Sequence, residues 1–282
     1  MSEFFLELFS EEIPAGLQKN LREKIFEDFK NLFEEKSIRS KKNFSFSTPN
    51  RLVLVFEGLD KQIKIKSKEI RGPKTSAPEQ ALEGFLRSNK IDKKDLFKKK
   101  TEKDEFYFYK TVATSLKTHD LLTEFIPKIL SNYQWKKSMK WGEFDLNWGR
   151  PLKSILSIFD KKIVSFKFHH LASSNLTFLD KDFEEKKRSF ENFKKYEKFF
   201  EDNGVIINQN KRLKIINKSF LKILGKKGLK INENPKLMDE VVNLVDSPNV
   251  LLCKFDKKFL SVPKEILTLT MESHQKYFPT FN

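Results

Sequence analysis

The stretch from residue 15 to about residue 36 constrains the fold most, because its apolar residues recur at every fourth position. The series consists of Leu17, Leu21, Ile25, Phe29 and Phe33. This spacing places them along one side of an α-helix, which must bury that stripe against another layer. Residues 4–9 just before it are typical of a strand, and Pro14 suits a first helical turn. The order predicts a sheet covered by an amphipathic helix.

The rest of the chain alternates between strand-like and helix-like stretches. Strands are predicted at residues 44–48, 51–56, 63–66, 105–112, 152–159, 163–168 and 250–255, and helices from about 78 and at 120–132, 182–202, 209–224 and 234–245. Residues 69–73 and 98–100 are predicted as a turn and a solvated loop, and Cys253 as a small core residue. We therefore expect an α+β fold, with mixed or antiparallel sheets flanked by amphipathic helices.

Length and composition indicate two domains. A chain of 282 residues is more typical of two domains than of one, and its composition changes after the strand that ends near His170. We expect an N-terminal α+β domain at residues 1–172 and a second α+β domain at residues 173–282. The final residues are apolar and have no capped end, so the second domain is expected to be incomplete at its C-terminus.

The net charge of +16 favours a nucleic-acid partner but has a competing explanation. The chain has 47 Lys against 8 Arg, with 29 Phe and 5 Ala, a composition also produced by AT-rich codon usage. The scarce arginines are therefore more informative than the lysines. Three of them adjoin turn-like sequence and, with one lysine of a polar cluster near the C-terminus, are the candidate RNA-binding residues: Arg51, Arg71, Arg150 and Lys276.

All three tryptophans lie between residues 135 and 148, and two of them precede a glycine. Such pairs fit a buried loop between two layers, and they also fit a surface that meets a partner. Trp141 and Trp148 are therefore candidate core or partner anchors. His274 and Tyr277 join them, because residues 274–278 place an imidazole, an amide, an ammonium and a phenol together.

The motifs of a self-sufficient catalyst are missing from the sequence. It has no glycine-rich phosphate loop, no Gly-x-Ser-x-Gly elbow and no Cys/His ligand cluster, so no catalytic residue and no metal ligand is assigned. Residues 105–112 are a strand by their aromatic and β-branched content; the aromatics could stack on bases, but this role is disfavoured because the glycines of an RNA-binding sheet motif are missing. No apolar stretch reaches about 20 residues, so we expect a cytoplasmic protein without membrane contact.

Several stretches together resemble the β subunit of the bacterial two-subunit-type glycyl-tRNA synthetase. They are FFLELFSEEIP at residues 4–14, TPNRL at 48–52, IRGP at 70–73, MKWG at 139–142 followed by RP at 150–151, LVDSP at 244–248, and FLSVPKEIL at 259–267 continuing as TMESHQKYFP at 270–279. No single stretch is diagnostic, but six in the same order span nearly the whole chain.

This resemblance implies a function that the residues alone do not. In that family the β subunit supports recognition of tRNA(Gly) and assembles with an α subunit, which uses ATP and Mg²⁺ to attach glycine to tRNA. The resemblance therefore implies a glycine–tRNA ligase that is active as a complex, with no cofactor bound by this chain. The family continues into a helical HD-type domain and an anticodon-binding domain, so this chain is expected to be the N-terminal part. The alternative is a non-catalytic RNA-binding or assembly module derived from that subunit.

Overall fold

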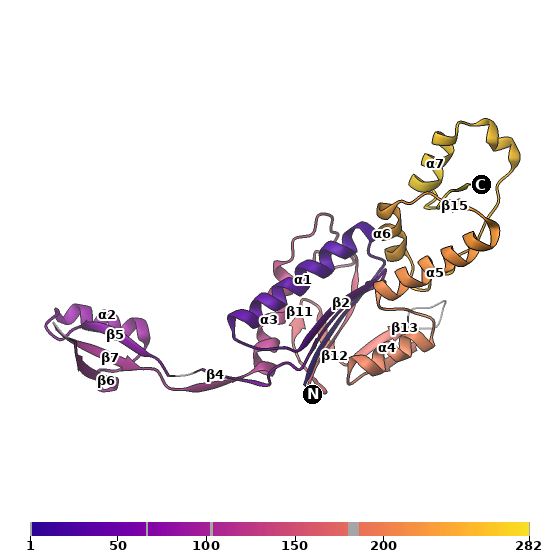
Figure 1. The fold of residues 1–282 in the computed structure, drawn as a ribbon. Coiled ribbons are helices and arrows are strands. Elements are labelled where there is room, and N and C mark those ends of the chain that lie inside the picture. Colours follow the sequence, from indigo (N-terminus) through magenta and orange to yellow (C-terminus); the bar gives the residue numbers. More distant parts are fainter. Residues whose placement is uncertain (1, 66, 102–103, 180–185, 282) are drawn as a thin grey trace. The chain divides into compact units, whose positions relative to one another are not determined.

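Figure 1 shows the fold of the chain in a computed structural model. The structure describes residues 2–65, 67–101, 104–179 and 186–281. Backbone contacts divide the chain into two compact units, one formed by Met1–Asp60 with His119–Asn282 and the other by Lys61–Thr118. We call the first the main unit and the second the inserted unit, because its sequence interrupts that of the first.

The main unit is built on a seven-stranded sheet with the strand order β11-β12-β9-β1-β3-β2, in which β10 also pairs with β9. Its strands are β1 (Glu3–Ser10), β2 (Lys42–Thr48), β3 (Arg51–Glu57), β9 (Leu152–Phe159), β10 (Lys162–Ile163), β11 (Lys167–Phe168) and β12 (Leu171–Ser174). Strand β1 pairs antiparallel with both β3 and β9, whereas β12 runs parallel to β9. The sheet is mixed, and the predicted α+β class is confirmed.

Strand β1 is apolar on both sides because both faces of the sheet are covered. Successive strand residues point to opposite faces. The ring of Phe4 lies 5.5 Å from that of Phe29 on α1 (Ala15–Glu35), and the ring of Phe5 lies 4.9 Å from that of Tyr196 on α4 (Phe193–Asp202). The continuous run of buried residues along β1 therefore reflects two layers of helices.

The predicted stripe on the first helix is confirmed. Leu21, Ile25, Phe29 and Phe33 are all buried, while Leu17 is half-buried. Pro14 precedes the first helical residue as the N-cap and lies just outside the helix. The helix α3 (Thr118–Asn132) was also predicted, and it includes Pro127 without starting late.

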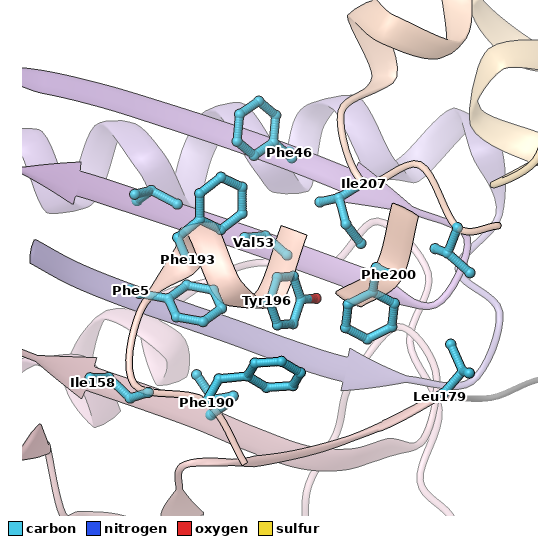
Figure 2. Close-up of a cluster of buried hydrophobic side chains, with 13 residues drawn as sticks. Phe5, Phe46, Val53, Ile158, Leu179, Phe190, Phe193, Tyr196, Phe200 and Ile207 are labelled. Carbon is cyan, nitrogen blue, oxygen red and sulfur yellow. The ribbon is translucent and has the colours of Figure 1, made fainter. Parts of the chain in front are cut away.

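A cluster of buried aromatic and aliphatic side chains fills the face of the sheet under α4 (Figure 2). Figure 2 shows Phe5, Val53 and Ile158 from the strands facing Phe193, Tyr196 and Phe200 from the helix. The hairpin of β13 (Leu176–Leu179) and β14 (Lys186–Ser189) contributes Leu179, and Phe190 follows it. The helix predicted at residues 182–202 begins only at Phe193, because Lys186–Ser189 pairs as a strand; residues 182–185 lie outside the described residues.

The last third of the main unit is mostly helical. It contains α5 (Gln209–Lys227), α6 (Pro235–Leu244), the 3-10 helix η2 (Lys257–Ser261), α7 (Lys264–Ser273), and the short strands β15 (Lys230–Ile231) and β16 (Thr280–Phe281). The helix α6 starts as predicted, with Asn234 as its N-cap. The helix α5 runs past Gly225, where its end was predicted, to Lys227, and Gly228 follows as a left-handed cap with a φ of 64°.

Two predictions for this part are wrong. Residues 250–255 form no strand, and Cys253 is exposed. The residues of this segment line a cleft. In the described structure no strand pairs with them through backbone hydrogen bonds.

The inserted unit contains a two-stranded ribbon and a small sheet. The ribbon pairs β4 (Gln62–Ile65) with β8 (Thr114–Lys117), and the sheet has the order β5-β7-β6, formed by β5 (Glu69–Lys74), β7 (Glu105–Lys110) and β6 (Leu96–Lys100). The helices are α2 (Glu79–Asn89) and η1 (Lys93–Asp95). The strand β7 was predicted, whereas the expected turn at 69–73 and loop at 98–100 are strands, because β7 supplies a ladder for both.

The two compact units do not test the predicted domain division. Residues on both sides of position 172 belong to the main unit, and the separate unit is Lys61–Thr118. The division into residues 1–172 and 173–282 stays a prediction.

Among the described residues, no helix is both long and apolar enough to span a membrane.

Candidate functional site

Arg51 lies in the interior of the main unit. Its Nε is 2.9 Å from Oε1 of Glu7, and its side chain is 2% exposed. Its guanidinium also lies 4.4 Å from the ring centre of Phe9 and donates to the carbonyl oxygen of Phe178. In this fold, Arg51 joins β1 to β3 and has almost no surface to offer a phosphate group.

The acid that pairs with Arg51 also binds a buried phenol. The hydroxyl of Tyr196 donates to Oε1 of Glu7 at 2.8 Å. Burial raises the pKa of the Glu7 carboxyl, and the positive charge of Arg51 opposes that rise. Burial and the neighbouring carboxylate raise the pKa of Tyr196 well above its usual value of 10.0. This closed network stabilises the contact between α4 and the sheet.

Trp148 is a core anchor. It is 2% exposed, and its ring packs edge-on against Trp135 at 5.0 Å and against Phe168 at 5.7 Å. Gly149 follows it because a Cβ there would lie 2.1 Å from the ring of Trp135. The Trp-Gly pair is thus explained by close packing.

Trp141 lies at a shallow cavity on the surface of the main unit. The cavity is about 480 Å³, and Trp141, Phe144 and His170 line part of it. The rings of Phe144 and His170 are stacked at 3.6 Å, and Trp141 meets His170 edge-on at 5.8 Å. Trp141 is therefore more accessible to a partner than Trp148.

Arg150 is half-buried, and its Nη1 donates to the carbonyl oxygen of Gly149 at 2.8 Å.

The C-terminal cluster lies beside an apolar cleft. The cleft is about 880 Å³, and both Lys276 and Tyr277 line it. Lys276 forms an ion pair with Glu240 on α6 at 2.9 Å, whereas Tyr277 is 58% exposed and His274 is exposed at the end of α7. The ammonium of Lys276 is held by Glu240, so in this structure Lys276 joins the segment after α7 to α6.

The inserted unit carries a disproportionate share of the charge. Of its 58 residues, 16 are Lys or Arg and eight are Asp or Glu, so it has a net charge of +8, half that of the whole chain. This half is concentrated in about a fifth of the residues. Codon usage acts on the whole gene, so it does not explain the concentration in one unit.

One face of the small sheet combines aromatic rings with cations. Arg71 and Phe97 pair in register with Phe108, and Lys99 pairs with Phe106. Residues paired in this way lie on the same face of an antiparallel sheet. We call this set the aromatic face: Arg71, Phe97, Lys99, Phe106 and Phe108.

The aromatic face is exposed at Arg71, Phe97 and Lys99, whereas Phe106 is only 6% exposed. Phe97 is 37% exposed, and its ring stacks on that of Phe108 at 6.0 Å. The guanidinium of Arg71 lies 3.6 Å from the ring centre of Phe106, which it covers. The helix α2 packs on β5 through Phe85, whose ring occupies the space beside Gly72. Of the candidate RNA-binding residues, Arg71 is the one that the structure places in a basic surface.

Residues 105–112 were predicted as a strand with base stacking disfavoured, so the combination of rings and cations on this face was not predicted. A signal was available, because the aromatic run follows shortly after three consecutive lysines at residues 98–100. It could not be interpreted without knowing that residues 96–100 pair with β7.

Among the described residues, no group of three or more His, Cys, Asp or Glu side chains could hold a metal ion. The chemistry available at the aromatic face is attraction of polyanions and contact with π systems.

Comparison with known proteins identifies the family. The family model described as glycyl-tRNA synthetase beta subunit matches residues 4–282. The chain belongs to this family. The resemblance inferred from the six sequence stretches is confirmed.

Named relatives agree with the family model. The chain is 39% identical over 282 residues to the glycine–tRNA ligase beta subunit of Rickettsia bellii, covering all of this chain and 43% of that protein. The proteins of the same name from Rickettsia canadensis and Rickettsia felis are 38% and 37% identical, with 42% and 43% of their lengths covered. The chain thus spans less than half the length of these curated relatives and corresponds to their N-terminal part.

Proposed function

We propose that this chain serves as the N-terminal part of a glycine–tRNA ligase β subunit and binds tRNA(Gly) through its inserted unit. The complete enzyme would join it to an α subunit, which would use ATP and Mg²⁺ to attach glycine to tRNA in the cytoplasm. Membership in the glycyl-tRNA synthetase beta subunit family supports the ligase assignment over a stand-alone RNA-binding module. In this proposal, the chain positions the nucleic acid and the α subunit performs the chemistry.

The observation that carries the tRNA-binding role is the charge of the inserted unit. A net charge of +8 on 58 residues attracts a polyphosphate regardless of its sequence. Lys98, Lys99 and Lys100 are exposed on β6, and Lys99 also forms a solvent-exposed ion pair with Glu69 at 2.9 Å, so the three lysines present positive charge to phosphates. Arg71 adds a guanidinium, which forms forked contacts that lysine does not.

A charge-reversal experiment tests this role. We expect Lys98→Glu, Lys99→Glu and Lys100→Glu together to weaken binding of the purified chain to tRNA(Gly) at least about tenfold at low salt. The slope of log affinity against log salt should also become shallower, by roughly one for each phosphate that the variant no longer neutralises. Fluorescence anisotropy with labelled tRNA measures both quantities.

A matched variant controls for net charge. Lys214, Lys218 and Lys222 are exposed on α5 in the main unit, and their reversal to Glu changes the total charge by the same amount. We expect this variant to bind tRNA(Gly) within about threefold of wild type. Equal losses of affinity in the two triple variants would contradict a role for the inserted unit.

The proposed partnership has its own test. The chain alone should show no glycine-dependent exchange between ATP and pyrophosphate, because the proposal places adenylate formation in the α subunit. Co-purification with an α subunit should show a stable complex. Exchange activity in the isolated chain would overturn this division of roles.

A further inference from the structure

We propose that the aromatic face binds an unpaired stretch of RNA, with bases stacked on Phe97 and Phe108 and phosphates held by the cations around them. This inference rests on the proposed tRNA-binding function and specifies how the inserted unit would engage its ligand. It concerns Arg71, Phe97, Lys99, Phe106 and Phe108, which share one face of the β5-β7-β6 sheet.

The rings are placed to receive a base. Phe97 and Phe108 pair across β6 and β7, with ring centres 6.0 Å apart and planes inclined by 28°. Phe97 is 37% exposed, although a phenyl ring at a surface contacts water at a cost. A flat heterocycle that stacks on this ring would remove apolar area from water and gain the stacking energy that aromatic platforms provide to successive bases.

Cations lie close enough to hold the backbone of a strand whose bases stack there. On the aromatic face, the ammonium of Lys99 is 5.6 Å from the ring centre of Phe108, and the guanidinium of Arg71 is 3.6 Å from that of Phe106. Lys99 is 56% exposed in its ion pair with Glu69, so it can turn toward a phosphate at little cost. Lys99 on β6 and Arg71 on β5 flank the rings of β7 on this face, so they supply positive charge beside the place where bases would stack.

Duplex RNA fits this face less well. In an A-form helix the bases are stacked on each other and the protein meets phosphates and 2′-hydroxyl groups. An exposed phenyl ring gains little from such a surface, whereas the lysines gain as much as with a single strand. The rings therefore favour unpaired nucleotides, and the charge alone favours neither form.

The test compares two RNA probes with leucine variants of the full chain. One probe is a 12-nucleotide oligouridylate and the other a blunt 12-base-pair RNA duplex. We expect Phe97→Leu with Phe108→Leu to weaken oligouridylate binding at least about fivefold, the loss expected from one stacked base. Duplex binding should change by less than about twofold, because leucine keeps the charge and most of the volume.

The chain offers a matched control for the aromatic change. Phe44 on β2 is also 37% exposed, and its ring also stacks on a neighbour, Phe46, at 6.0 Å. Phe44→Leu should leave oligouridylate binding unchanged. Phe97→Trp restores a larger π surface and should bind at least as tightly as wild type. Thermal unfolding of each variant shows whether the fold is kept.

The outcomes separate this inference from the proposed function. Leucine variants that bind oligouridylate like wild type would overturn the stacking inference. If reversal of Lys98, Lys99 and Lys100 still weakened tRNA(Gly) binding, the proposed function would stand without it. Equal losses of affinity for oligouridylate and duplex would also overturn the inference, because stacking predicts a loss only for unpaired bases. Wild-type chain that binds neither tRNA(Gly) nor oligouridylate would overturn both.

Discussion

The Nε atom of Arg51 on β3 lies 2.9 Å from Oε1 of Glu7 on β1, and neither side chain is more than 2% exposed. The two residues are diagonal neighbours, because Glu7 pairs in register with Val53. Tyr196 of α4 donates to the same carboxyl oxygen at 2.8 Å. One carboxyl group thus links two strands and the helix that covers them.

Replacing Arg51 should destabilise the fold strongly. Arg51→Met removes the cation and leaves the buried Glu7 carboxyl without its charge partner, so we expect a loss of about 3–5 kcal/mol in the free energy of unfolding. Arg39→Met, at an exposed position, should cost less than about 0.5 kcal/mol. Urea denaturation followed by circular dichroism measures both. A small effect of Arg51→Met would mean that the pair contributes little.

The buried carboxyl should make stability depend on pH. Burial raises the pKa of Glu7 in the folded state above its unfolded value, so the folded state binds this proton more tightly. The resulting stabilisation is complete below the unfolded pKa of about 4.3 and is lost as pH rises through the folded pKa. Glu7→Gln cannot titrate, so its free energy of unfolding should fall less than that of wild type as pH rises from 4 to 7. Parallel curves for the two proteins would contradict the raised pKa.

The two candidate tryptophans should differ in their effect on stability. Trp148 is 2% exposed and in contact with two rings, so Trp148→Ala should cost about 3–5 kcal/mol. Trp141 is half-buried at the edge of a cavity, and Trp141→Ala should cost less than half as much. Differential scanning calorimetry would show a lower Tm for the first variant. The reverse order would place Trp141 in the core.

Arg212 should hold the last helices on the main sheet. From α5 it donates to the carbonyl oxygens of Ser47 at 2.8 Å and Val242 at 2.9 Å, and burial lowers its pKa to about 10. Lysine carries its donors on a single nitrogen and cannot reproduce the separate Nε and Nη2 contacts of Arg212, so Arg212→Lys should cost about 3 kcal/mol. Hydrogen exchange of the α6 amides should accelerate. Unchanged protection in α6 would show that other contacts, such as the 2.7 Å hydrogen bond from Gln18 to the carbonyl oxygen of Asn243, hold this helix without Arg212.

Local patterns were sufficient where an element buries one stripe or one run of its own residues. The period-four series of α1 and the Asn234 cap of α6 both depend on neighbours in sequence, and both were predicted. Strands β5 and β6 were not, because their backbone ladders come from β7, which begins only at Glu105. Residues 250–255 look like a core strand, but no partner strand pairs with them in the described structure.

For the candidate site too, the sequence identified residue types but not their positions in the fold. The scarcity of arginine singled out Arg51 and Arg71 equally, yet one is buried beside a carboxylate and the other covers a ring on an open sheet. The composition gives the net charge of the chain but does not show where the charged residues lie in the fold. The concentration in the inserted unit became visible only when backbone contacts separated residues 61–118 from the rest.

The sequence by itself determined the family, the mixed class of the fold and the main amphipathic elements, because these depend on residue order and spacing. The tertiary structure decided which charged groups are buried and which rings remain in contact with water. Those outcomes depend on strands that pair over long distances in sequence, and pairing brings Phe97, Phe108 and Arg71 onto one face.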